Sequence, residues 1–362
     1  MRNPAIDPLI ESLVRPHSMA ELSLKEWDAL LPRARATLLL PRLAKLAERY
    51  GLIDGVPEVV HRHLITGIEL AREQERSLKW ELQRLERTLA ALNCPVLLLK
   101  GAAYVATGLP MADGRLVSDI DIMIPPEALG GAESELLRAG WQFSKMDDYD
   151  RRYYLEWMHE LPPLRHRQRQ TLLDVHHAIL PRTSRLRPDI SLLWAAAQPV
   201  PGARFLTLSP ADMLLHCAAH LFQDGDLHWR LRDLFDLHQM MDEFGRQSDF
   251  WPVLFTRAKM LDLERPLYYA SRYCRRILAT EIPAEAASKL ERLAPSATAR
   301  MGMDCVIPQT LIPPEGGPGV SSQGAALFLY MRSHWLRMPP PLLAAHLARK
   351  TFKRMREIRQ TG

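Results

Sequence analysis

Cysteine is scarce in this chain, and the few cysteines present are far apart. Among the 362 residues there are four, and no two of them form a CxxC pair. Disulfide frameworks and cysteine zinc sites place their cysteines at short, recurring spacings. The sequence therefore argues against a disulfide framework and against a cysteine zinc site. The four cysteines are Cys94, Cys217, Cys274 and Cys305.

Long apolar runs are also missing. No stretch approaches the roughly 20 apolar residues that a membrane-spanning helix needs. The start of the chain, MRNPAIDPLIESLVRP, has neither the apolar core nor the small-residue cleavage site of a secretory signal. We therefore expect no membrane span and a cytoplasmic location.

The excess of positive charge is small, with a formal net charge of +5. It permits an anionic ligand such as a nucleotide, but by itself it does not indicate nucleic-acid binding. The content of 47% hydrophobic and 25% charged residues is typical of globular proteins. A chain of this length usually forms more than one packed unit.

Helical patterns dominate both ends of the chain. From Ser12 to Asn93 the clearest section is LKWELQRLERTLAALN, residues 78–93, whose leucines recur every three or four positions and predict a long amphipathic helix. Its charged residues are expected on the solvated side; they are Glu81, Arg84, Glu86 and Arg87. After Pro201 the pattern is helical again, with Ser209 as a predicted N-cap and two or three helices up to about Arg300.

The middle of the chain mixes strands and helices. Short apolar runs followed by Gly or Pro predict strands, and the stretches between them predict helices. The strands expected are VLLL (96–99), LVSDIDIMI (116–124) and TLLDVHHAIL (171–180). The helices expected are AAYVATGLP (102–110) and PEALGGAESELLRAGW, ending at Gly140, while residues 141–170 are expected to be a polar hairpin or loop.

Two carboxylates interrupt the second apolar run. In a strand Asp119 and Asp121 project from one face, while Ile120 and Ile122 face the other. Two ionised carboxylates about 6 to 7 Å apart in a dry setting repel each other unless a cation lies between them. Mg²⁺ takes oxygen ligands from protein carboxylates and substrate phosphates, so this strand is suited to a metal–nucleotide complex. Asp174 interrupts the third apolar run in the same way and is the best candidate for a third metal ligand.

Four stretches together resemble a known family. LLLKGAAYVATGLP, RLVSDIDIMI, LLDVHHAIL and LSPADMLLHCAAHL are similar to the uncharacterised nucleotidyltransferase family of the polymerase-beta-like nucleotidyltransferase superfamily. The resemblance covers roughly residues 90–240. It implies an α+β fold, in which a small mixed β-sheet forms the nucleotidyltransferase core between largely helical N- and C-terminal regions. It also implies that Asp119, Asp121 and Asp174 are the catalytic, metal-binding residues, with Mg²⁺ or Mn²⁺ as cofactor and a nucleoside triphosphate as co-substrate.

The same resemblance suggests residues that bind the nucleotide. The broader superfamily has Gly-Gly or Gly-Ser near its first helix, where this chain has Lys100-Gly101. Lys100 and Arg115 can contact phosphate, or alternatively neutralise the acids. Ser118 can bind phosphate through its hydroxyl, and His176 shares the strand face of Asp174, where it can orient a ligand or the acceptor.

Other interpretations of these residues stay open at this level. Asp119 and Asp121 can form a salt bridge with Arg115, and Asp174 can pair with an arginine or with His159. The whole chain can also be a non-catalytic nucleotide-binding or regulatory protein on the same fold.

A third alternative is a helical zinc hydrolase. His216 and His220 lie one helical turn apart, the spacing at which two imidazoles share a zinc ion, with Asp233 or Asp236 as third ligand. A role in helix packing and hydrogen bonding is the simpler interpretation of this pair.

The expected domain organisation follows from these patterns. Residues 1–92 form a helical region, 93–200 the catalytic core, 201–300 a helical domain, and 301–362 a Pro/Gly-rich connector with a basic C-terminal helix. The acceptor of the nucleotidyl group is not identified by the sequence.

Overall fold

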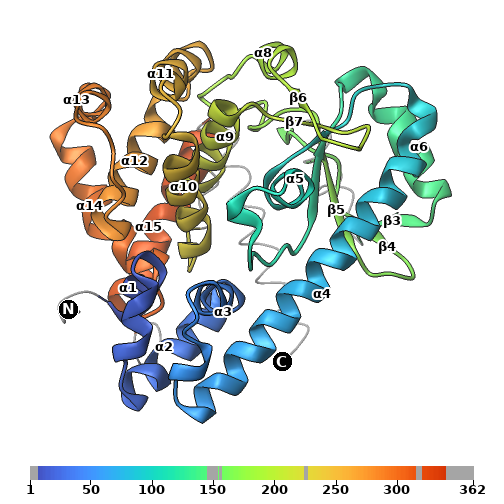
Figure 1. The fold of residues 1–362 in the computed structure, drawn as a ribbon. Helices are drawn as coiled ribbons and strands as arrows, with labels where there is room; N and C mark the ends of the chain where they lie inside the picture. The colour runs from blue at the N-terminus through green and yellow to red at the C-terminus, as the bar shows by residue number, and fades with distance from the viewer. Residues whose placement is uncertain (1–6, 145–153, 155–156, 224–226, 315–319, 340–362) are drawn as a thin grey trace, which may run out of the picture.

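The computed structural model describes residues 7–144, 154, 157–223, 227–314 and 320–339. The fold is α+β, as expected, and one mixed sheet comes between two helical regions in chain order. In Figure 1 the N-terminal (blue) and C-terminal (orange) helices lie beside each other, on one side of the sheet. The basic segment expected at the C-terminus, residues 342–360, lies outside the described residues.

The N-terminal region is helical, which confirms the prediction for residues 12–93. Its helices are α1 (Pro8–Val14), α2 (Leu24–Ala36), α3 (Leu40–Arg49) and α4 (Glu58–Leu89), with short 3-10 turns at Pro16–Glu21, Ile53–Gly55 and Ala90–Leu92. The long helix α4 packs on α3 near one end and on α5 (Lys100–Thr107) and α6 (Leu129–Arg138) further along (Figure 1). It therefore joins the N-terminal helices to the sheet.

The amphipathic pattern of α4 is confirmed with one exception. The leucines at 78, 82, 85 and 89 are buried, but Glu81, which was expected on the solvated side, is buried as well and only 4% exposed. The guanidinium of Arg169 explains this, because it donates to both carboxylate oxygens of Glu81, from Nε at 2.8 Å and from Nη2 at 2.7 Å. Arg169 itself follows β4 (Leu164–His166), so the loop arginine has a structural role.

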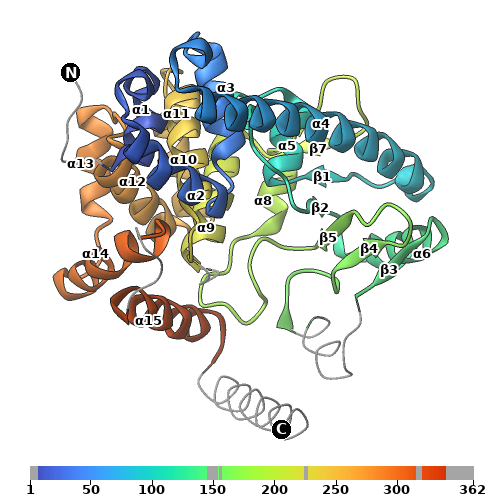
Figure 2. The same ribbon diagram turned by 90° about the horizontal axis from the view of Figure 1, so that it is seen from below.

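Among the residues that the structure describes, the sheet has seven strands in the order β3-β4-β5-β2-β1-β7-β6. The strands are β1 (Leu97–Leu98), β2 (Ile120–Met123), β3 (Trp141–Phe143), β4, β5 (Leu172–His176), β6 (Gln198–Pro199) and β7 (Leu206–Thr207). β2 is parallel to β5 and antiparallel to β1, and β1 is parallel to β7. Figure 2 shows the strands from β7 to β3 side by side. The three strands expected from the sequence are the three at the centre of the sheet, although each is shorter than its apolar run.

The expected polar segment 141–170 is a hairpin in part. Its two ends pair as β3 and β4, which are antiparallel, with Trp141 opposite His166. The helices expected between the central strands are present as α5 and α6, and a further short helix, α8 (Ile190–Ala195), precedes β6.

The C-terminal half is more helical than expected. Ser209 caps α9, since its Oγ accepts the N–H of Asp212 at 3.3 Å. In the described part of this region, five helices, instead of two or three, end before Arg300: α9 (Pro210–Gln223), α10 (Leu231–Phe244), α11 (Phe250–Met260), α12 (Glu264–Leu278) and α13 (Ala284–Arg292). The expected connector at 307–324 is helical at both ends, because α14 (Ala297–Leu311) and α15 (Val320–Arg337) extend into it; its prolines did not prevent this, and Pro308 lies inside α14.

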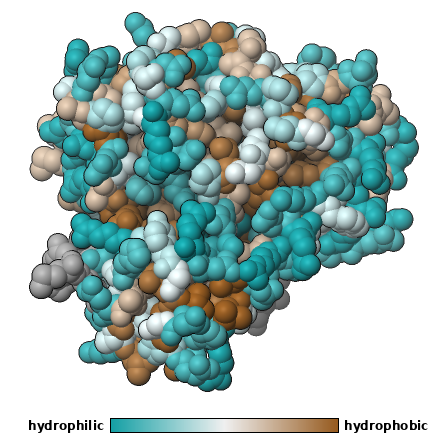
Figure 3. Space-filling view, viewed as in Figure 1, coloured by the Kyte–Doolittle hydropathy of each residue, from teal (hydrophilic) through white to brown (hydrophobic). Residues whose placement is uncertain are grey.

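Apolar side chains from all parts of the described chain form one core. The cluster includes Leu9 of α1, Leu97 of β1 and Leu329 of α15. Polar residues cover most of the face in Figure 3, and its apolar residues form separate groups. Within the described residues, no helix combines the length and apolarity needed to cross a membrane. The division into units at residues 92, 200 and 300 stays a prediction.

Candidate active site

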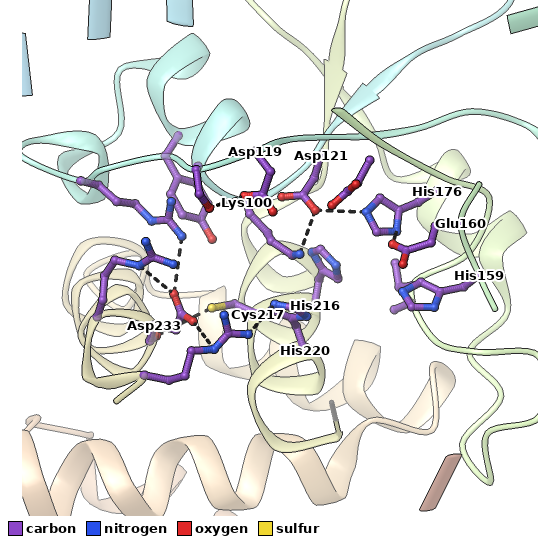
Figure 4. A pocket seen from close by; sticks show the side chains of 18 of the residues that line it. Lys100, Asp119, Asp121, His159, Glu160, His176, His216, Cys217, His220 and Asp233 are labelled. Carbon is purple, nitrogen blue, oxygen red and sulfur yellow. Dashed lines mark hydrogen bonds and ion pairs between the residues drawn. The ribbon is translucent and has the colours of Figure 1, made fainter. Parts of the chain in front are cut away.

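Two of the three aspartates lie on neighbouring parallel strands, and the third directly precedes one of these strands. In the register of β2 and β5, Asp121 lies directly opposite Asp174. Asp119 was expected within the strand, but β2 begins at Ile120 and Asp119 lies in the bend before it. All three line one pocket of about 410 Å³. Figure 4 shows Asp119 and Asp121 side by side along one wall of this pocket.

Main-chain hydrogen bonds fix the backbone around these acids. The N–H of Leu99 donates to the carbonyl of Asp121 at 3.0 Å, and the N–H of Ile124 donates to the carbonyl of His176 at 3.0 Å. The residues that alternate with the acids, Ile120 and Ile122, are buried on the opposite face. Burial of this apolar face sets the register, because a slip by one residue would turn the carboxylates into the core.

The negative charge of Asp121 is compensated by two basic side chains. Lys100 Nζ lies 2.9 Å and His176 Nε2 lies 3.1 Å from Asp121 Oδ1. Burial alone would raise the pKa of this carboxyl, but Lys100 and His176 reverse the effect and hold it well below its ordinary value. Asp121 is therefore ionised in the folded protein.

Asp174 has the opposite electrostatic environment. Burial, and after it the charges of Glu160 and Asp121, raise the pKa of Asp174 to about 7. The carboxyl of Asp174 is thus held near neutral pH by burial and by two neighbouring acids. Clustered carboxylate oxygens are the donors that suit an oxygen-preferring divalent cation.

Asp119 and Ser118 are bound to each other at the pocket. Ser118 Oγ donates to Asp119 Oδ1 at 2.7 Å, and both residues line the pocket. The hydroxyl of Ser118 thus has a partner within the site.

Lys100 and Gly101 form the turn from β1 into α5. Lys100 has a φ of 44°, a left-handed backbone conformation that residues other than glycine rarely adopt. A Cβ at Gly101 would collide with the guanidinium of Arg115 and come within 2.7 Å of Val117 Cγ2. Lack of a side chain at Gly101 therefore lets Arg115 lie against the first turn of α5.

Arg115 does not pair with the aspartates on β2. Its Nε donates to Asp236 at 2.7 Å and its Nη2 lies 3.6 Å from Asp233, both on α10. Burial alone would lower the pKa of Arg115, but Asp236 and Asp233 raise it above its ordinary value. The salt bridge considered between Arg115 and Asp119 or Asp121 is thus replaced by pairs with α10, although Arg115 still lines the pocket.

Helices α9 and α10 form the wall opposite the sheet, and it is basic. His216, His220, Arg230 and Arg232 line the pocket from this side. Burial, and after it the charges of Lys100 and His220, hold the pKa of His216 well below its ordinary value, so its ring is neutral. Sequence reasoning missed Arg230 and Arg232, because nothing in their local pattern places them opposite the aspartates.

The zinc alternative at His216 and His220 has no third ligand among the residues proposed for it. Asp233 lies 3.0 Å from Arg230 Nε and 3.2 Å from Arg232 Nε. Asp236 accepts from Arg42 Nη1 at 2.8 Å and from Arg115. Both carboxylates are therefore bound by arginines.

His159 and Glu160 are further pocket residues that the sequence did not single out as part of a site. Glu160 bridges to His176 as an isolated β-bridge beside β5, and Glu160 Oε2 lies 3.3 Å from His176 Nδ1. The rings of His159 and His176 have centroids 5.2 Å apart. His177, in contrast, lines a different cavity, next to Trp194.

The chain is similar to one protein family and to several solved structures. The profile of a family described as uncharacterised nucleotidyltransferase matches residues 23–279. Among solved structures, JHP933 from Helicobacter pylori is 13% identical, with a TM-score of 0.32 over 72% of this chain and 94% of that chain. An antigenic nucleotidyltransferase-like protein from Paracoccidioides brasiliensis is 15% identical, with a TM-score of 0.31 over 58% of this chain and 95% of that chain. No curated protein matches the chain.

Proposed function

The chain belongs to the uncharacterised nucleotidyltransferase family, and on that premise we propose that it is a metal-dependent nucleotidyltransferase. It moves a nucleoside monophosphate from a nucleoside triphosphate to an acceptor and releases pyrophosphate. The single observation that carries this proposal is the in-register pair of Asp121 and Asp174, with Asp119 beside them in one pocket.

The three aspartates are suited to hold Mg²⁺ or Mn²⁺. They offer only oxygen atoms and line one pocket, and burial, followed by the charges of Glu160 and Asp121, raises the pKa of Asp174 to about 7. When bound, divalent ions polarise the attacking oxygen and neutralise the charge on the leaving pyrophosphate.

The chain's own residues act on the two substrates. In the transfer, the acceptor oxygen forms a bond to the α-phosphorus, and the bond from that phosphorus to the pyrophosphate oxygen breaks. Asp174 takes the proton of the acceptor hydroxyl, since a carboxyl whose pKa lies near neutral pH is suited to general-base catalysis. Asp119 and Asp121 would hold the divalent cation.

Phosphate binding involves the first turn of α5 and the basic wall. Helix N-termini present unpaired backbone N–H groups to anions, and α5 begins at the pocket with Lys100 and Gly101. Arg230 and Arg232 add positive charge from α10 on the opposite side. A triphosphate between these two walls would place its α-phosphorus near the aspartates.

A non-catalytic nucleotide-binding protein is the second candidate. The observation that favours it is the contact of 2.9 Å between Lys100 Nζ and Asp121 Oδ1. An ammonium group in this place neutralises one carboxylate of the site and competes with a divalent ion for it. This candidate predicts nucleotide binding without turnover.

The test is incubation of the protein with α-³²P-labelled nucleoside triphosphates, Mg²⁺ and candidate acceptors, with pyrophosphate release measured in parallel. Labelled product and pyrophosphate in equal amounts support the transferase, and both should disappear in Asp119→Asn and Asp121→Asn. Calorimetry with each nucleotide and Mg²⁺ separates the two candidates. Binding without label transfer favours the non-catalytic protein, and absence of nucleotide binding would contradict both.

A further inference from the structure

Three pocket residues other than the aspartates have the chemistry of a different cation site. His159, Glu160 and His176 each offer one ligand atom, and these atoms all lie within 4.8 Å of one another. Imidazole nitrogens with one carboxylate are a donor set that Zn²⁺ prefers, whereas Mg²⁺ prefers oxygen ligands alone. The aspartates and this cluster therefore suit two different classes of cation.

The separation of one ligand pair agrees with a tetrahedral ion. In tetrahedral zinc sites the bonds are about 2.0–2.1 Å long, so two ligand atoms are about 3.3 Å apart. His176 Nδ1 and Glu160 Oε2 lie 3.3 Å apart. Despite this distance the two atoms do not meet the angles of a hydrogen bond, and within the described residues the buried His176 Nδ1 has no hydrogen-bond partner. Both atoms are thus placed to share a third atom between them.

The backbone holds these ligands in place. The segment that carries His159 and Glu160 runs along β5, where the N–H of Leu161 donates to the carbonyl of Val175 at 2.8 Å. The N–H of His177 donates to the carbonyl of His159 at 2.8 Å. His159 is only 9% exposed and His176 only 4% exposed. Buried ligands on a fixed backbone need little rearrangement to bind an ion.

We propose that His159, Glu160 and His176 form a zinc site that is separate from the three aspartates and linked to Asp121 through the ring of His176. The other ring nitrogen of His176, Nε2, lies 3.1 Å from Asp121 Oδ1 (Figure 4). Zinc at Nδ1 fixes the ring proton at Nε2, which then donates to Asp121. Metal-binding histidines commonly donate in this way to a carboxylate. Zinc binding itself does not depend on the proposed transfer reaction, but the effect on Asp121 rests on it.

The experiment measures zinc in the full-length protein. The protein is stripped with EDTA, returned to buffer with excess Mg²⁺, and equilibrated with Zn²⁺ before elemental analysis. We expect one zinc per chain in the wild type. His159→Gln and Glu160→Gln should each lower the zinc affinity by about 100-fold or more. Co²⁺ provides a second measurement, because its visible absorption bands should appear in the wild type and be lost in both variants.

Two controls share the same pocket. His216→Gln removes a buried histidine from the opposite wall, and Asp119→Asn removes a proposed magnesium ligand; both should bind zinc as the wild type does. Absence of zinc from the wild type in excess Mg²⁺, or its loss in His216→Gln, would overturn the site. If one of the two ligand variants does not fold, the other variant and the wild-type stoichiometry still decide.

The two proposals fail separately. Zinc binding without any transfer of label refutes the transferase and leaves the zinc site in place. Transfer of label by a protein that binds no zinc refutes the zinc site alone. If zinc orients Asp121, His159→Gln should also weaken Mg²⁺-dependent nucleotide binding, and added imidazole should not restore it.

Discussion

Asp121 and Asp174 lie opposite each other on two neighbouring parallel strands, yet folding shifts the pKa values of their two carboxyls in opposite directions. Lys100 and His176 keep Asp121 ionised, whereas burial and the surrounding acids raise the pKa of Asp174 to about 7. Two acids with such different pKa values in one cavity are a common arrangement in active sites. The following predictions start from this pair.

Removal of any one aspartate should abolish activity and leave the fold intact. Asp119→Asn, Asp121→Asn and Asp174→Asn each lose a proposed metal ligand, and we expect the rate of the proposed transfer to fall by about 100-fold or more. The amide has almost the same shape as the carboxylate, so circular dichroism spectra should match the wild type. Full turnover in Asp119→Asn together with Asp121→Asn would contradict the assignment of both.

The metal-free protein should lose stability as the pH rises. The pKa of Asp174 is about 7 in the folded state and about 3.9 in the unfolded state. The folded state therefore holds this proton more tightly, so the stabilisation is complete below about pH 4 and is lost as the pH rises to about 7. We expect the free energy of unfolding to fall by about 2 kcal/mol between about pH 5.5 and pH 8 from this group alone.

Urea denaturation in EDTA at several pH values measures this dependence. Asp174→Asn should remove it, and should be more stable than the wild type at about pH 8, where the wild-type carboxylate is charged. Saturating Mg²⁺ should remove the difference, because the ion compensates the charge. The same pH slope in the wild type and in Asp174→Asn would show that Asp174 is not its source.

Gly101 should be intolerant of even a methyl group. In Gly101→Ala the new Cβ collides with the guanidinium of Arg115 and lies 2.7 Å from Val117 Cγ2. We expect a loss of about 1–3 kcal/mol in the free energy of unfolding, as for other overpacked sites. Transfer activity should fall as well, because Arg115 and the first turn of α5 both line the pocket.

Gly130→Ala is the matched control for this substitution. Gly130 lies in α6, and a Cβ there meets no atom within 4 Å. Since alanine favours helices by up to about 1 kcal/mol over glycine, this variant should be as stable as the wild type or more stable. Equal stability of both variants would show that Arg115 moves away at no cost.

The central strands and the grouping of the three aspartates in one pocket could be predicted from the sequence because their signals are local; the catalytic role of these aspartates stays a prediction. Apolar runs gave the strands β1, β2 and β5, and the spacing of Asp119 and Asp121 placed them on one face. Asp174 was recognisable because it too interrupts an apolar run. Such patterns depend only on neighbouring residues, so they need no knowledge of tertiary structure.

The rest of the site depends on contacts between distant segments. Glu160 reaches His176 only because its segment runs antiparallel to β5, and Arg232 reaches the pocket only because α10 packs opposite the sheet. Glu81 was expected in solvent because helix periodicity gives the direction of a side chain and not its partner. The hydrogen bond from Arg169 compensates the charge of the buried Glu81 carboxylate. The partner of Arg115 was missed for the same reason, since Asp236 lies 121 residues further along the chain.

Asp236 should be one of the most important polar residues for stability. It is fully buried and accepts from Arg42 Nη1 at 2.8 Å and from Arg115 Nε at 2.7 Å. It thereby joins the N-terminal helix α3, the segment before β2 and helix α10. Asp236→Asn leaves two buried guanidinium groups without their common counter-charge, which should cost about 3–5 kcal/mol of unfolding free energy. Asp242→Asn on the same helix is the control. Its pair with Arg246 is exposed, so the loss of unfolding free energy should stay below about 1 kcal/mol.

Urea denaturation of Asp236→Asn and Asp242→Asn gives the comparison. Losses of equal size would mean that this buried network does not stabilise the contact between α3 and α10.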